Sequence, residues 1–175
     1  MPYLARKISF AKWEPKDGLE PHEIPADAIT GDLRTTDNAL SLWSCEVADQ
    51  PSLRRAALAL AASADRVDKL DLVWVDRDRF ADDGITLKET EGKTPVVAMR
   101  EAHVDACALD HQRLGRVAHS IATALREGQS FRFTRRDVLH LIVEGLENRM
   151  LGLAELSEKV RVEAQRVLNE RRNPQ

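Results

Sequence analysis

The order of three apolar segments between residues 38 and 76 constrains the fold of this chain more than any other feature. The stretch NALSLWSCEV alternates apolar residues with serines, which predicts a half-buried strand. In SLRRAALALAASADRVDKL, apolar residues recur at the three- and four-residue spacing of one buried helical face. The β-branched and aromatic run LDLVWVD predicts a strand in the middle of a sheet. This order indicates a strand–helix–strand crossover unit, although one unit does not establish a doubly wound fold.

The first 50 residues divide into a basic segment and an acidic one. The stretch YLARKISFAKW mixes apolar and basic residues and predicts an edge strand. In EPKDGLEPHEIPADAITGD, closely spaced prolines and glycines break regular structure, which predicts a long loop. Residues 14–50 carry nine acids against two bases. Because such a surface repels phosphate groups, any contact with nucleic acid would have to avoid it.

The second half of the chain is predicted to be mostly helical. Residues 77–95 read as an irregular or hairpin excursion. A short helix is expected through VVAMREA, and Asp110 and Thr134 are expected to cap later helices. The three later helices are predicted over residues 110–127, 135–149 and 153–170.

Length and composition favour a single α+β domain over residues 1–175. A chain of 175 residues buries roughly two thirds of its unfolded surface, which supports a core without disulfides. Only 5% of residues are aromatic, so that core must consist mainly of Leu, Val, Ile and Ala. We expect a small N-terminal β-sheet with packed helices in a sheet-containing part at about residues 1–95, and an α-helical part at about residues 96–172.

The sequence also favours a cytoplasmic location. Its beginning, MPYLARKISFAKW, has no uninterrupted apolar stretch of the kind that directs secretion, and no segment reaches the roughly 18 apolar residues that span a bilayer. We therefore expect reduced Cys45 and Cys107 thiols and no membrane partner. The arginine- and alanine-rich composition is common in bacteria with GC-rich genomes.

One series of residues raises the question of a metal site. His103, Cys107 and His111 are spaced four apart, and His119 follows eight residues later. Helical positions four apart can share a metal ion, but positions eight apart lie about 12 Å apart along the axis and cannot. If the helix breaks before Asp110, these three side chains are no longer held at the spacing of one continuous helix, but the fourth metal ligand is unspecified. Core or capping histidines are the favoured interpretation; a metal site and a ligand contact stay as alternatives, and no cofactor is expected.

A second pattern suggests catalysis. Asp76 ends the strand LDLVWV, and the triplet Glu91–Gly92–Lys93 follows it. Some Mg²⁺-dependent nucleases use an acid on one strand and an acid-x-Lys triplet on the next. Here the triplet lies in a turn just before a proline, so solvated loop charges are favoured. A metal-dependent enzyme acting on nucleotides or nucleic acid is the alternative function.

A DNA-binding regulator is the second alternative. Lys159, Arg161 and Arg166 on the last predicted helix are suited to a DNA groove. Residues 129–175, however, carry nine basic residues against seven acidic ones, which is a weak basic stripe for a DNA-binding module.

No catalytic pattern is convincing, so an enzyme is not favoured. We expect a cytoplasmic interaction subunit with a regulatory or accessory role, whose partner is another protein. The partner would engage Glu20, Glu23 and Asp27 of the acidic segment or the C-terminal helix. Nucleic acid is not the favoured partner, and a homo-oligomer remains an alternative.

Overall fold

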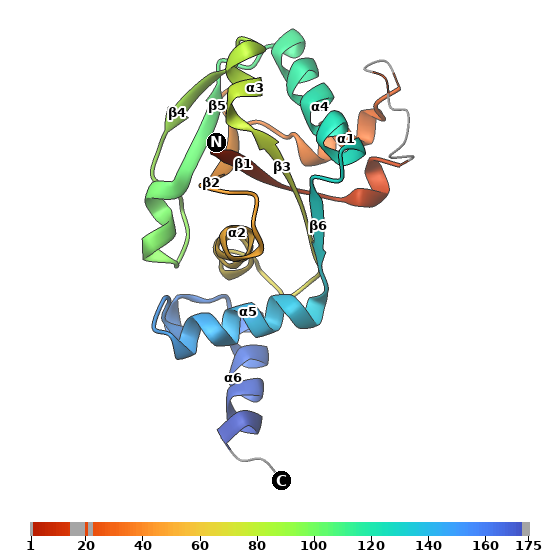
Figure 1. The fold of residues 1–175 in the computed structure, drawn as a ribbon. Coiled ribbons are helices and arrows are strands. Elements are labelled where there is room, and N and C mark those ends of the chain that lie inside the picture. Colours follow the sequence, from red (N-terminus) through yellow and green to blue (C-terminus); the bar gives the residue numbers. More distant parts are fainter. Residues whose placement is uncertain (1, 15–19, 21–22, 173–175) are drawn as a thin grey trace.

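The computed structural model describes residues 2–14, 20 and 23–172 of the chain. Within them, six strands form one antiparallel sheet in the order β4-β5-β2-β1-β3-β6 (Figure 1). The strands are β1 (Tyr3–Ile8), β2 (Leu40–Cys45), β3 (Leu70–Asp76), β4 (Thr86–Glu89), β5 (His103–Cys107) and β6 (Ser130–Phe133).

Helices cover both faces of this sheet, and the predicted α+β class is confirmed. The α-helices are α1 (Ala26–Asp32), α2 (Gln50–Ala62), α3 (Arg77–Asp82), α4 (His111–Arg126), α5 (Arg135–Glu147) and α6 (Glu158–Arg172). Short 3-10 helices are η1 (Phe10–Lys12), η2 (Val97–Ala102) and η3 (Leu153–Glu155). None of the helices in the described part of the chain is long and apolar enough to cross a membrane.

Strand β1 is central, and its prediction as an edge strand is wrong. It pairs with β2 on one side and with β3 on the other. Its basic residues suggested an exposed edge, but Arg6 turns its guanidinium onto backbone carbonyls. The Nη1 atom of Arg6 donates to the carbonyl of Ser41 at 2.7 Å, and Nε and Nη2 donate to that of Asp32. A cation held in this way is compatible with the middle of a sheet.

The predicted crossover joins β2 to β3 through α2. Both strands run antiparallel to β1, so they are parallel to each other with β1 between them. Helix α2 begins after Asp49, whose carboxylate accepts a hydrogen bond from the backbone N–H of Ser52 at 2.8 Å. Its apolar face packs on the side of the sheet that carries Trp43 and Leu72.

A second crossover, from β5 to β6 through α4, covers the opposite face of the sheet. Asp110 caps α4 as predicted and accepts a hydrogen bond from the backbone N–H of Arg113 at 2.8 Å. The strands of this crossover lie beyond residue 95, where mostly helical structure was expected. The helix expected through VVAMREA is the 3-10 helix η2, and β5 follows it directly.

Helix α5 lies outside α2, and α6 crosses α5 and projects away from the sheet (Figure 1). The predicted cap of α5 is present, because Thr134 and Asp137 form a reciprocal capping box. Helix α5 packs on α2, and α6 packs on α5 through the buried side chains of Val160, Ala164 and Leu168. The outward face of α6 is the one that carries the exposed residues Val162, Arg166 and Asn169.

Two segments predicted to be irregular contain regular elements. The excursion over residues 77–95 contains α3 and β4, and the acidic segment contains α1. The carboxylate of Asp32, at the end of α1, accepts hydrogen bonds from the backbone N–H of Ser9 at 2.7 Å and from Nε1 of Trp13 at 2.9 Å. These long-range bonds hold α1 against the end of β1. Residues 15–19 and 21–22 of the predicted loop lie outside the described residues.

Candidate interaction site

The histidine–cysteine series does not lie on one helix. His103 and Cys107 are the two ends of strand β5, and exposed His111 begins α4. Residues four apart on a strand lie about 13 Å apart, so His103 and Cys107 cannot share one metal ion. Among the residues that the structure describes, no group of three His, Cys, Asp or Glu side chains is placed to hold a metal ion.

The helical interpretation of this series failed because a spacing of four is also two periods of a strand. In HVDAC, polar residues alternate with Val104 and Ala106, which are buried against α4 and its neighbours. His103, Asp105 and Cys107 therefore share the other face of the sheet. This period of two is the signal that would have found Asp105, which the sequence analysis missed.

His103 belongs to a closed hydrogen-bond network. Its ring is 9% exposed and packs edge-on against Trp43, with the ring centroids 5.2 Å apart. Thr90 Oγ1 lies 2.8 Å from Nδ1 of His103 and donates its proton to the carboxylate of Asp105 at 2.9 Å. The hydroxyl of Thr90 has one proton, and it donates that proton to Asp105. The hydrogen bond between Thr90 and His103 therefore requires a proton on Nδ1 of His103. With Nδ1 protonated, His103 cannot accept a proton from the hydroxyl of Thr90 and cannot activate it as a nucleophile.

The electrostatics of His103 agree with a neutral ring. Burial lowers the pKa of His103, the charge of Asp105 opposes this effect, and the charge of Arg6 adds to it. This arrangement supports the interpretation of His103 as a core residue.

The proposed nuclease residues lie on separate parts of the sheet. Asp76 ends β3 and caps α3, accepting a hydrogen bond from the backbone N–H of Asp78 at 2.9 Å. Exposed Glu91 and Lys93 lie in the loop between β4 and η2. Strands β1, β2 and β5 lie between β3 and β4, so the acid and the triplet do not come from neighbouring strands.

Packing explains the glycine of this triplet. Gly92 is buried, and a Cβ atom there would lie 2.8 Å from Cη2 of Trp43 and 2.9 Å from Cβ of His103. The glycine is therefore required for the loop to approach the sheet, which accounts for it without a catalytic role.

The three acids expected to bind a partner are exposed. The carboxylate of Glu23 accepts a hydrogen bond from the backbone N–H of Glu20 at 2.9 Å, and Asp27 lies in the first turn of α1. Helix α1 packs with the core on the α4 side of the sheet, whereas α5 and α6 lie on the α2 side. The acids and the C-terminal helix are thus two separate surfaces.

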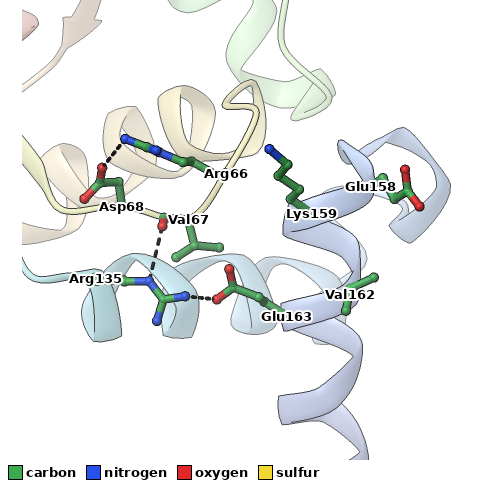
Figure 2. A pocket seen from close by; sticks show the side chains of 8 residues that line it. All are labelled: Arg66, Val67, Asp68, Arg135, Glu158, Lys159, Val162 and Glu163. Carbon is green, nitrogen blue, oxygen red and sulfur yellow. Dashed lines mark hydrogen bonds and ion pairs between the residues drawn. The ribbon is translucent and has the colours of Figure 1, made fainter.

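The surface that joins α6 to the rest of the molecule is hollowed. A groove of about 880 Å³ lies between the loop after α2, the start of α5, and α6. Figure 2 shows the side chains that line it. Val67 and Val162 are its apolar side chains. Its charged side chains are Arg66, Asp68, Arg135, Glu158, Lys159 and Glu163.

Arg135 holds the walls of this groove together. Its Nε atom donates to the backbone carbonyl of Val67 at 3.3 Å, and its guanidinium pairs with Glu163 of α6 (Figure 2). Lys159 and Glu158, in contrast, make no ion pair within 4.0 Å with any residue in the described ranges. The groove therefore combines two ion pairs, Arg135–Glu163 and Arg66–Asp68, with two uncommitted charges of opposite sign.

An exposed apolar side chain completes the groove. Val162 is 62% exposed, and the only other exposed large apolar side chains of the described residues are Val47 and Val97. Sequence reasoning identified Lys159 alone among the groove's charged residues. The others come from segments up to 97 residues apart (Arg66 to Glu163), so no local motif connects them.

Comparison of the chain with protein-family models, with curated proteins and with solved structures finds no match.

Proposed function

We propose that this chain is a non-catalytic cytoplasmic subunit with a regulatory or accessory role, which binds another protein through the groove of Figure 2 and the outward face of α6. The observation that supports this most directly is exposed Val162 beside uncommitted charges of both signs. A protein partner can cover the valine and pair with Glu158 and Lys159 together. Nucleic acid is a poorer fit, because the groove has three acids against three bases and therefore offers no net positive charge to phosphate.

The expected energetics favour a small number of dominant contacts. Burial of a valine side chain that is mostly exposed in the free protein contributes about 1.5 kcal/mol or more. Pairing of rim charges contributes mainly to the rate and specificity of association. A charge substitution at Val162 should therefore reduce affinity more than neutralisation of Lys159.

Glu20, Glu23 and Asp27 have a different role in this proposal. They lie on the other side of the sheet from the groove, so they steer a basic partner during approach rather than contact it in the same patch. Replacing all three by Gln or Asn should slow association, most clearly at low salt, and leave stability within about 0.5 kcal/mol.

The test compares two valines of similar exposure. Val162→Glu changes the groove, whereas Val97→Glu changes η2, where the valine is 60% exposed. Each full-length variant is expressed at native level, and proteins that co-purify in stoichiometric amounts are identified. A partner retained by wild type and Val97→Glu but lost with Val162→Glu supports the proposal.

Two outcomes contradict it. Retention of the same partner by Val162→Glu excludes the groove as its binding surface. Absence of any stoichiometric partner from wild-type protein excludes a stable subunit role altogether.

A further inference from the structure

A second groove, of about 540 Å³, lies between α2 and α5. Each helix contributes residues at i, i+3, i+4 and i+7, which start at Pro51 on α2 and at Leu141 on α5. The volume of the groove lies within the range of roughly 300–1,000 Å³ typical of small-molecule sites.

The floor of this groove is apolar. Leu58 and Leu141 line it with side chains that are each 4% exposed, and half-buried Met150 closes one end. Gly145 brings the helices close together, because a Cβ atom there would lie 2.6 Å from Cδ2 of Leu151 and 3.1 Å from Cδ2 of Leu58. The close approach creates a narrow apolar floor instead of a flat helix surface.

The rim of the groove carries one positive charge without a close partner. Arg54 and Glu144 pair across it at 2.7 Å and neutralise each other. Arg55 is exposed and makes no ion pair within 4.0 Å among the described residues. The carboxylate of Asp49, which caps α2 and keeps its negative charge, balances part of the charge of Arg55 at longer range.

We infer that this groove binds a small apolar monocarboxylate. The apolar body lies on Leu58, Leu141 and Met150, and the carboxylate pairs with the guanidinium of Arg55. The Arg54–Glu144 pair crosses the groove between its two walls, which favours a slender occupant over a peptide helix of about 10–12 Å in width. This site is independent of the proposed protein interaction.

The experiment uses three probes with the same apolar chain and different head groups: octanoate, octanol and octylammonium. Each is titrated into the full-length protein, and binding is followed by chemical-shift changes of the backbone amides. We expect octanoate to bind up to about fivefold more tightly than octanol, since its ion pair with the exposed Arg55 distinguishes them, and octylammonium to bind most weakly. The largest shifts should lie at residues of α2 and α5.

Two variants and a control localise the site. Arg55→Gln should remove the preference for octanoate, and Met150→Trp should weaken all three probes by filling the end of the groove. Arg126→Gln, at an exposed arginine near the end of α4 on the opposite face of the sheet, should change nothing. Equal affinities for the three probes, an octanoate preference that survives Arg55→Gln, or no binding at all would overturn the inference.

Discussion

Ending the chain after Arg149 should unfold the whole protein. This truncation removes η3 and α6, and with them four large side chains that are buried in the core shared by α2 and α5: Leu151, Leu156, Val160 and Leu168. Burial of each contributes about 1.5–3 kcal/mol, so the loss is about 6–12 kcal/mol. The net stability of a domain is about 5–15 kcal/mol, and most or all of it would therefore be lost.

A shorter truncation is the matched control. Ending the chain after Leu168 keeps all four buried side chains and removes two ion pairs, Arg171–Glu147 and Arg166–Glu170, in which all side chains are more than one third exposed. Such a surface pair contributes about 0–1 kcal/mol, so this variant should stay folded. Val160→Ala in the full chain should cost about 2 kcal/mol, because it removes two buried methyl groups.

Circular dichroism during denaturant unfolding measures these effects. The chain ending at Arg149 should show no cooperative transition, and the chain ending at Leu168 should unfold near the wild-type midpoint. A cooperative transition near the wild-type midpoint for the chain that ends at Arg149 would refute the reasoning, because the domain would then fold without α6. A shift from dimer to folded monomer would instead assign α6 to an interface between two copies.

Two further predictions concern His103 and the proposed nuclease residues. Burial lowers the pKa of His103 below its ordinary value of 6.5, so on acidification this histidine binds a proton first in the unfolded chain, and stability should fall as the pH drops below about 6.5. His103→Gln should remove this part of the pH dependence of stability, and an unchanged dependence would contradict the prediction. Mg²⁺ or Mn²⁺ should support no cleavage of single- or double-stranded nucleic acid, and a chelator should leave the melting temperature unchanged. Cleavage that vanishes in both Asp76→Ala and Lys93→Ala would establish the nuclease alternative.

The predictable parts of the site are those that depend on neighbouring residues in the chain. Lys159 could be placed on a C-terminal helix because apolar residues recur at helical spacing around it. Its neighbours in the groove, Arg66 and Arg135, carried no such signal, because they precede it by 93 and 24 residues. Only packing of α6 on α5 places them together.

The sequence by itself determined the α+β class, the α2 crossover, and the caps of α4 and α5. These features depend on periodicity and on hydrogen bonds that span three residues, such as Asp110 to Arg113 and Thr134 to Asp137. The tertiary structure decided which strands are neighbours, and therefore made β1 central and separated Asp76 from Lys93. It also decided that residues 103–107 form a strand. A spacing of four residues fits both a helix and a strand, and only the pairing with β2 and β4 distinguishes between them. These pairings of β5 join residues up to 66 positions apart (Leu40 and Ala106), and local sequence patterns do not specify them.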